Sequence, residues 1–179
     1  MHSDESIMQQ VADGDIRQLG QLYDRYKQPL YGFLCGRTDR ATAEDLLQTS
    51  FERVIKYRGS FKGPSFRAWL YTIARNALSD RQRADGKIPV KNGMDLTTLK
   101  NITPSCHEAW EKKEIKKQSE SALAALPENY REVVDMAWKR GMKYAEIATV
   151  LGTSEANVKV RIHRATKQLR VNYAKLNRQ

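Results

Sequence analysis

The sequence predicts an all-α protein made of two small helical domains joined by a flexible linker. Apolar residues recur at intervals of three and four residues, the period of an amphipathic helix, in segments before residue 84 and after residue 108. The stretch between them has no sustained period and is rich in Gly, Pro and Asn, as linkers are. We therefore expect an N-terminal domain at residues 1–84, a linker at 85–107 and a C-terminal domain at 108–179.

Three or four helices are expected in the first domain, and three of them can be placed. The first covers about Asp15–Leu34, and Pro29 predicts a break or kink near its middle because proline cannot donate the helical hydrogen bond. The second covers Thr42–Tyr57, opened by Thr42 or by Arg40–Ala41 just before it, and has Glu44 and Asp45 in its first turn, where the helix dipole favours anions. The third follows a loop rich in Gly and Pro and covers residues 65–83, with Ser65 as its N-cap.

The second domain is expected to hold about four helices and to end in a helix-turn-helix. Its first helix starts near Glu108, and its second covers Pro127–Arg140. The pattern of Tyr144–Leu151 predicts a short helix that a left-handed Gly152 closes. Ser154 can then accept a hydrogen bond from the amides that open the last helix.

The last helix is predicted to have an apolar stripe on one side and a basic face on the other. The apolar stripe consists of Val158, Ile162, Ala165 and Leu169. The opposite face consists of Lys159, Val160, His163, Arg164 and Lys167, with Arg161 at its edge. A Gly turn followed by such a helix is typical of a reader that enters the DNA major groove. An ordinary hairpin with a solvated face is the alternative, but that face would mix both charge signs, whereas residues 153–179 hold seven Lys or Arg and a single acid.

The uneven charge of the chain predicts two contacts with a polyanion and a separate surface for another partner. The formal net charge is +10, yet residues 1–52 hold nine Asp or Glu against five Lys or Arg. Residues 53–83 hold eight Lys or Arg and one acidic residue. An anionic membrane is the alternative polyanion, but no run approaches the roughly 20 apolar residues of a membrane span. The polar start is unlike a signal peptide, so we expect a cytoplasmic protein without membrane insertion.

The cysteines and histidines do not form a metal-binding pattern. Cys35 and Cys106 are far apart, and neither has a second cysteine at the spacing of a zinc or redox motif. The three histidines show no ligand spacing either, so we expect no disulfide, metal or cofactor. Cys35 is expected to be a small buried residue.

Aromatic and cationic side chains are interleaved between residues 57 and 83, which suits single-stranded nucleic acid. Aromatic rings stack on unpaired bases, at about 1–3 kcal/mol each, while cations hold the phosphates. The aromatic residues are Tyr57, Phe61, Phe66, Trp69 and Tyr71. The alternative is that these rings belong to the core, and we assign Phe66 and Trp69 to it.

Both halves of the chain resemble the extracytoplasmic-function (ECF) sigma factors of bacterial RNA polymerase. In the first half the resemblance lies in Ala43–Phe51 and in the loop and helix of Phe61–Asn76. In the second half it lies in Leu123–Val133, Tyr144–Ala148 and Asn157–Ala165, which are similar to the family's fourth conserved region. The order and separation of the two halves make the resemblance specific. It implies a transcription initiation factor, in which the first domain recognises the minus-ten promoter element and helps to open the duplex and the second recognises the minus-thirty-five element.

The resemblance also implies roles for particular residues. Family members capture an unstacked base between this loop and helix, where Asn76 matches the family's base-contacting residue. The minus-ten set is Phe61, Lys62, Ser65, Tyr71, Arg75, Asn76 and Arg81. The minus-thirty-five set is Lys159, Val160, Arg161, His163, Arg164 and Lys167. Asp45, Gln48 and Glu52 are the candidates for docking on core RNA polymerase.

The partners implied by the resemblance are the two largest subunits of core RNA polymerase and both double-stranded and melted promoter DNA. An anti-sigma factor is a common further partner in the family. Two other functions compete with this interpretation. A plain DNA-binding regulator would account for residues 123–172 but not for residues 42–83. A DNA-processing enzyme would need a phosphate loop, paired metal carboxylates or an activated nucleophile, and no such motif is present. We therefore expect no enzymatic activity.

Overall fold

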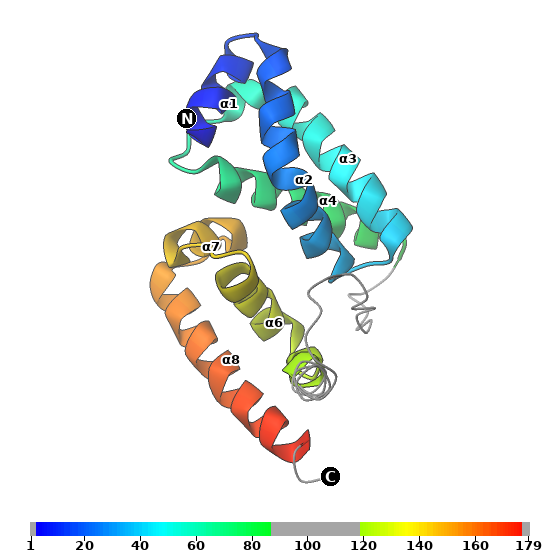
Figure 1. The fold of residues 1–179 in the computed structure, drawn as a ribbon, viewed down its shortest axis with the longest axis vertical. Coiled ribbons are helices and arrows are strands. Elements are labelled where there is room, and N and C mark those ends of the chain that lie inside the picture. The colour runs from blue at the N-terminus through cyan, green and yellow to red at the C-terminus, as the bar shows by residue number, and fades with distance from the viewer. Residues whose placement is uncertain (1–2, 87–118, 177–179) are drawn as a thin grey trace, which may run out of the picture.

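The described part of the chain, residues 3–86 and 119–176 of a computed structural model, consists of helices arranged in two lobes (Figure 1). The first lobe contains α1 (Asp4–Ala12), α2 (Leu19–Cys35), α3 (Arg40–Lys56) and α4 (Phe66–Ala84), with short 3₁₀ turns η1 (Ile16–Gln18) and η2 (Arg58–Ser60). The second contains a helical segment at 119–124, α6 (Glu128–Val134), a π-helical turn η3 (Asp135–Lys139), α7 (Tyr144–Leu151) and α8 (Glu155–Leu176). The all-α prediction is confirmed. Beyond Gly86, the proposed linker and the helix expected near Glu108 lie outside the described residues.

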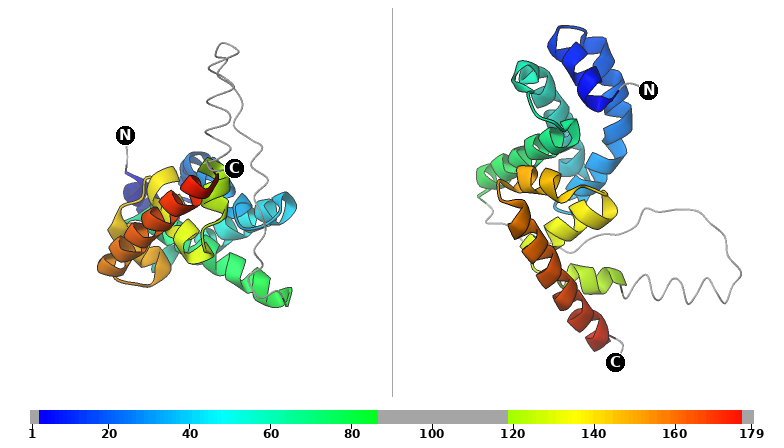
Figure 2. Two further views of the ribbon diagram at one scale, coloured as in Figure 1. Left: turned by 90° about the horizontal axis from the view of Figure 1, so that it is seen from below. Right: turned by 90° about the vertical axis from the view of Figure 1, so that its left-hand side faces the viewer.

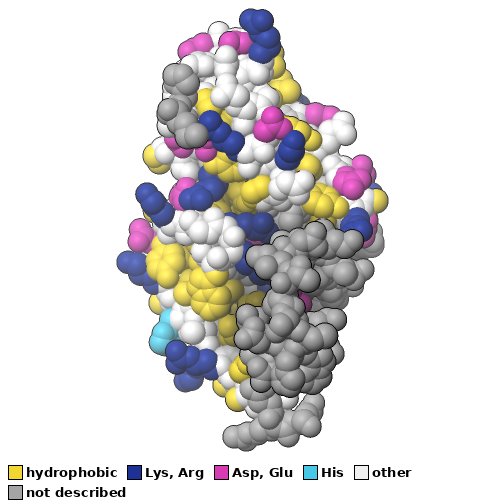
Figure 3. Space-filling view, in the orientation of Figure 1, with side chains coloured by type: hydrophobic (Ala, Val, Ile, Leu, Met, Phe, Trp, Pro, Cys, Tyr) yellow, Lys and Arg dark blue, Asp and Glu magenta, His cyan; other side chains and the backbone are white. Residues whose placement is uncertain are grey.

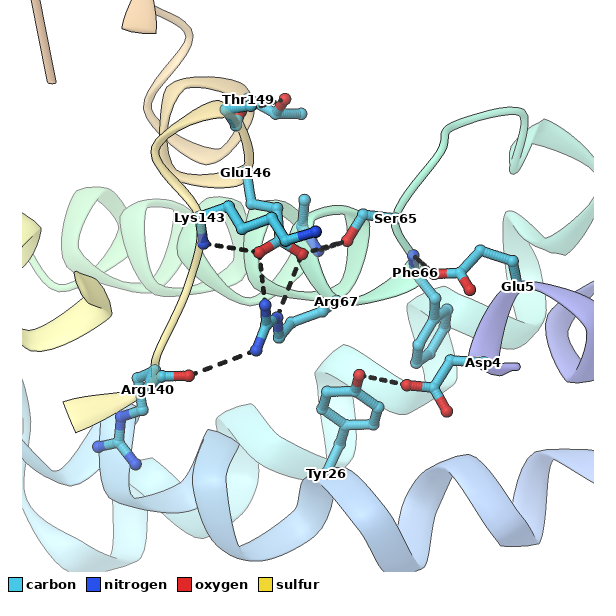
Figure 4. A network of polar contacts seen from close by, with 12 residues as sticks. Asp4, Glu5, Tyr26, Ser65, Phe66, Arg67, Arg140, Lys143, Glu146 and Thr149 are labelled. Atoms are coloured by element: carbon cyan, nitrogen blue, oxygen red, sulfur yellow. Dashed lines mark hydrogen bonds and ion pairs between the residues drawn. The ribbon is translucent and has the colours of Figure 1, made fainter. Parts of the chain in front are cut away.

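Helix α1 is a part of the first lobe that the sequence prediction did not include. The hydroxyl of Ser3 caps it by accepting from the amide of Ser6 at 3.1 Å, and Ile7, Met8 and Val11 are buried. The carboxylate of Glu5 accepts from the amide of Phe66 at 3.1 Å, so α1 also helps to satisfy the open amides at the start of α4 (Figure 4).

The predicted break at Pro29 does not occur, because α2 is one helix from Leu19 to Cys35. An interior proline costs about 3 kcal/mol through its lost hydrogen bond and the crowding of its ring. Beyond it, Leu30, Phe33 and Leu34 are completely buried. Burial of each such side chain contributes about 1.5–3 kcal/mol. Tertiary packing thus outweighs the local penalty and carries the helix through Pro29.

Helix α3 begins at the earlier of the two predicted positions, but its acidic residues lie outside the first turn. Asp39 is the N-cap: its carboxylate accepts from the amide of Thr42 at 3.0 Å and from the hydroxyl of Thr42 at 2.8 Å. The helix therefore begins at Arg40, and Asp45 lies beyond the first turn rather than within it. By contrast, Ser65 caps α4 as predicted, because its hydroxyl accepts from the amide of Ala68 at 3.2 Å.

The two lobes pack directly against each other in the described residues. Helix α7 of the second lobe lies along α4 of the first, and further views from two sides show the same closeness (Figures 1 and 2). Buried apolar residues of both lobes form one continuous core cluster. The face of α4 opposite to its own lobe is therefore covered in part by the second lobe, which matters for every site residue on that helix.

Candidate DNA and polymerase interfaces

The helix-turn-helix of the second lobe has the local structure that the sequence predicts. Gly152 ends α7 in the left-handed conformation, with φ 61° and ψ 41°. The amide of Thr153 then donates to the carbonyl of Ala148 at 3.0 Å, which satisfies one of the last carbonyls of the helix. The hydroxyl of Ser154 accepts from the amide of Asn157 at 3.2 Å and so caps α8.

Helix α8 is fixed by one side and open on the other. Val158, Ile162 and Ala165 are buried and Leu169 is partly buried, so the predicted apolar stripe is confirmed. The exposed residues are Lys159, Val160, His163, Arg164 and Lys167, while Arg161 is half-buried at the edge. Lys159 lies 3.5 Å from Glu155, an exposed pair of little energetic weight that leaves the lysine available to a ligand. The outer face of α8 is therefore a rigidly held row of mainly basic side chains.

Apolar side chains are exposed beside this basic row. Val160 keeps 47% of its surface exposed and Trp138, in the π turn, keeps 50%. Figure 3 shows hydrophobic side chains gathered on the same lobe, just below the junction with the first lobe. Val160 can make only apolar contacts, for example with the methyl group of thymine.

The first lobe places the predicted minus-ten residues in different surroundings. Lys62 and Asn76 are exposed, and Arg81 is exposed with its guanidinium 3.2 Å from the carboxylate of Asp85. Asn76 lies eleven residues beyond Ser65 on α4, which is about 16 Å along the axis at 1.5 Å per residue. Asn76 and the loop before α4 are thus too far apart to touch the same base, although they can touch successive nucleotides.

Two aromatic members of the minus-ten set are buried in this conformation. Phe61 packs against Phe66 and Trp69, with ring centroids 6.2 and 5.3 Å away. Tyr71 is 1% exposed and its ring meets the edge of Phe33 at 5.0 Å. Burial raises the pKa of Tyr71 to about 12. Phe61 lies in the loop before α4 and packs on the start of that helix, and Tyr71 packs on α2, so tertiary contacts account for the burial of both rings.

The residues predicted to dock on polymerase lie together on the exposed face of α3. Asp45, Gln48 and Glu52 are all exposed, and the amide group of Gln48 donates to the carboxylate of Glu52 at 2.9 Å. Beside them, a shallow groove between α3 and α4 contains the ion pair of Arg53 and Asp80 at 2.8 Å. This acidic face belongs to the first lobe and the basic face of α8 to the second, so they are separate surfaces.

Sequence reasoning missed a network of polar contacts between the lobes (Figure 4). The hydroxyl of Ser65 donates to the carboxylate of Glu146 at 2.7 Å, and the Nε of Arg67 donates to the same oxygen at 3.2 Å. The amide of Lys143 donates to the other oxygen at 2.8 Å. Burial alone would raise the pKa of Glu146, but the hydrogen bonds from Arg67, Ser65 and Lys143 lower it overall. Glu146 is therefore held as a carboxylate that joins α7 to the start of α4.

Two further ion pairs cross the same boundary. The Nε of Arg75 lies 3.1 Å from Glu132, and the guanidinium of Arg37 lies 3.6 Å from Asp135. Arg140 approaches the same oxygen of Asp135 at 3.5 Å, and neither Arg140 Nε nor that oxygen has a hydrogen bond of good geometry. We call these groups the interdomain clasp: Arg37, Arg67 and Arg75 from the first lobe, and Glu132, Asp135 and Glu146 from the second. Glu128, Glu132 and Asp135 lie on one helical face, but this pattern alone does not show which cations that face meets.

The described ranges contain neither a membrane-spanning helix nor a cluster of metal ligands. No helix there is long and apolar enough to cross a bilayer. No group of three or more His, Cys, Asp or Glu side chains in these ranges could hold a metal ion. Cys35 is half-buried rather than fully buried, while Cys106 lies outside the described residues.

The second lobe carries a helix-turn-helix with an exposed basic helix, and it packs on the first lobe, which has its own acidic surface. This arrangement is typical of a DNA-binding protein that also binds another protein. Comparison with protein families matches residues 22–88 to sigma-70 region 2 and residues 118–169 to sigma-70 region 4. The chain is 30% identical to the ECF RNA polymerase sigma factor SigM of Bacillus subtilis, over 87% of this chain and 94% of SigM. It is 34% identical to the ECF RNA polymerase sigma factor SigL of Mycobacterium tuberculosis, over 93% of this chain and 94% of SigL. The chain therefore belongs to the ECF sigma factors, which act in transcription initiation.

Solved structures agree with this fold. CnrH, solved in complex with the cytosolic domain of CnrY, is 26% identical and superposes with a TM-score of 0.66, covering 94% of this chain and 95% of CnrH. The sigma factor RpoE of Bartonella quintana, solved with the anti-sigma factor NepR, is 23% identical with a TM-score of 0.64 and covers 87% of this chain and 96% of RpoE. At 23% identity, the similarity to RpoE shows a shared fold.

Proposed function

We propose that this chain binds core RNA polymerase, recognises the minus-thirty-five and minus-ten elements of promoters, and promotes DNA melting by capturing an unstacked base. The observation that carries the proposal is helix α8, whose apolar side is fixed in the core while its outer row of basic side chains is open. That arrangement suits a helix held in a major groove. Membership of the sigma family supplies the polymerase as the machine that the DNA-bound chain would direct.

Within the second lobe, Lys159, His163 and Arg164 are proposed to reach base edges. Arg161, at the half-buried edge, and Lys167, near the middle of α8, are proposed to hold phosphates, which fix the register without reading sequence. Val160 would contact a thymine methyl or another apolar base edge.

Within the first lobe, Asn76 is proposed to contact the captured base, with Arg75 and Arg81 on the phosphates. Lys62 and Ser65 would belong to the loop that receives a neighbouring nucleotide. Phe61 and Tyr71, buried in this conformation, would form the apolar floor beneath the loop and α4. Extraction of a base costs a few kcal/mol, which stacking and amide hydrogen bonds can offset, so melting would need no ATP.

The proposed partners of the protein surfaces are subunits of polymerase. The exposed face of α3, with Asp45, Gln48 and Glu52, would dock on the coiled coil of the largest subunit. The second lobe would rest on the flap of the other large subunit, and residues 85–107 would link the two domains, 1–84 and 108–179. An anti-sigma factor is the regulatory partner that the family implies, and RpoE of Bartonella quintana is held in complex with one.

The test is reconstitution with core RNA polymerase on a library of randomised promoters. The proposal predicts promoter-dependent transcripts from core enzyme that makes none alone, with a selected sequence in both elements. A variant carrying Asp45→Lys and Glu52→Lys should lose affinity for core enzyme, whereas the control Asp13→Asn with Asp24→Asn should not. DNA binding without any transcripts would support a plain regulator instead and would contradict the proposal.

A further inference from the structure

The interdomain clasp uses the same side chains that the proposed function assigns to promoter DNA. Arg75, proposed to hold a phosphate, is paired with Glu132 at 3.1 Å. Ser65, proposed to belong to the minus-ten loop, donates to Glu146 at 2.7 Å. A carboxylate and a phosphate are both oxyanions that accept from guanidinium and hydroxyl donors in the same geometry. In the closed form the Nε–H of Arg75 and the single hydroxyl hydrogen of Ser65 are directed at these carboxylates, so the clasp and the minus-ten strand compete for the same donors.

The charge of the two lobes is complementary where they meet. Residues 53–83 of the first lobe hold eight Lys or Arg and a single acid. Against this segment the second lobe presents Glu132 and Glu146, with side chains only 15% and 14% exposed. The second lobe thus places carboxylates where the backbone of a nucleic acid would place phosphates.

The clasp also reaches the core beneath the minus-ten surface. Arg37 stacks on the ring of Phe33, 3.7 Å from its centroid, and Phe33 in turn packs on Tyr71. The hydroxyl of Tyr71 senses the charges of Arg140 and Asp135 from the second lobe as well as those of its own. Separation of the lobes would therefore release Ser65 and Arg75 and also break the pair of Arg37 with Asp135.

The pairs are placed so that loss of either partner favours separation. Arg37 and Asp135 are 9% and 12% exposed, so each needs the other while the lobes are closed. A charge left without its partner in such a place is strongly unfavourable, but it is solvated again when the lobes part. Neutralising the carboxylates should accordingly shift the equilibrium toward the open form.

We propose that the interdomain clasp closes the free protein and masks its minus-ten surface, with the second lobe acting in place of single-stranded DNA. This inference rests on the proposed function for the identity of the masked surface. Binding of polymerase to α3 and of the minus-thirty-five duplex to α8 does not use the clasp residues. Polymerase and the minus-thirty-five duplex can therefore both bind before the lobes open, and opening then makes Arg75 and Ser65 available to the melted strand.

The test uses a clasp variant that carries both Glu132→Gln and Glu146→Gln. Its control carries Asp13→Asn and Asp24→Asn and has the same change in net charge. Gln at 146 can keep the hydrogen bond to the amide of Lys143, and Asp13 and Asp24 are exposed residues away from the clasp. Fluorescence energy transfer between dyes at Lys56→Cys and Gln168→Cys, with Cys35 and Cys106 replaced by Ser, reports the separation of the lobes. Anisotropy of a short single-stranded DNA reports access to the minus-ten surface.

The proposal predicts lower transfer and at least about fivefold tighter DNA binding for the clasp variant, the lower end of a typical coupling between sites. The control should match the unmodified protein in both. Unchanged transfer, or open lobes without tighter binding, would overturn the inference. To exclude misfolding, Arg75→Glu should also open the lobes, and adding Glu132→Arg should close them again. Because neither readout uses polymerase, absence of transcripts from reconstituted enzyme would count against the proposed function alone.

Discussion

At the residue scale, the outer face of α8 distributes its roles among side chains that differ in charge and reach. Arg164 is exposed on that face. A guanidinium can bind a guanine through two parallel hydrogen bonds, whereas an ammonium acts as a point charge. Sequence preference should therefore depend more on Arg164 than on Lys167.

Replacing Arg164 with Ala should weaken binding of the upstream duplex by about 1–3 kcal/mol and relax the preference at one base pair. Lys167→Ala should weaken binding to every duplex sequence by about the same factor, smaller than the loss for Arg164→Ala, and should reduce the salt dependence of binding. Titration of the selected duplex and of single-base variants, at fixed salt, measures both effects. A loss below about 0.5 kcal/mol for Arg164→Ala would remove this residue from the base contacts.

Replacing Asn76 with Ala should impair promoter opening while leaving affinity for core polymerase unchanged. The side chain is exposed on α4 and away from α3, so its loss removes an amide from the proposed base contact without disturbing the docking face. Opening is followed by 2-aminopurine fluorescence in the minus-ten element, and core affinity by a binding titration. Normal opening by this variant would place the captured base elsewhere.

Glu146 gives closure of the lobes a dependence on pH. Its pKa is lowered below the ordinary 4.5 by its partners in the closed form. A carboxylate with a lowered pKa contributes stability above its ordinary value and loses that contribution as pH falls through the lowered one. Energy transfer between the lobes should therefore fall as the solution is acidified below about pH 4.5, and the fall should be smaller in Glu146→Gln. Identical curves for both proteins would contradict this role of Glu146.

At the scale of elements, the turn between α7 and α8 fixes how the reader helix is presented. Gly152 has a left-handed backbone, and no atom lies within 4 Å of where a Cβ would stand. The obstacle to a side chain there is thus conformational rather than steric, at roughly 1–2 kcal/mol.

Gly152→Ala should consequently destabilise the second lobe by about 1 kcal/mol. Gly20→Ala is the matched control, because Gly20 lies in α2 with equally open space and ordinary helical backbone. Ala is favoured over Gly inside a helix, so this change should stabilise by up to about 1 kcal/mol. Urea unfolding followed by circular dichroism measures both, and effects of the same sign would contradict the turn assignment.

Elements with a local signal were predictable, and those decided by tertiary contacts were not. The apolar stripe of α8, the Ser65 cap and the Gly152 turn depend on residues within one or two turns of each other. Continuity of α2 through Pro29 depends on burial of its second half against other helices, which no local pattern reveals. The exposure of Asp45, Gln48 and Glu52 followed from the helical period, whereas the burial of Phe61 and Tyr71 required knowing how the helices meet.

At the scale of the whole molecule, the largest gap in the sequence prediction is the docking of the lobes. The pairs Arg75 with Glu132 and Arg67 with Glu146 join residues 57 and 79 positions apart. Charge counts per segment revealed the basic stretch but not which carboxylates would meet it. The fold class and the family resemblance could be read from the sequence, while the clasp that covers part of the minus-ten surface could be seen only in three dimensions.

In the proposed function, one lobe of this chain binds paired DNA and the other binds melted DNA. Together they position a polymerase that is made of other chains. Permanganate footprinting of a selected promoter tests this proposal most directly, because permanganate attacks only unstacked thymines. We predict reactive thymines in the minus-ten element when this chain and core polymerase are present together, and none with either alone. A duplex protected by this chain, but left fully stacked whether or not polymerase is present, would contradict the account.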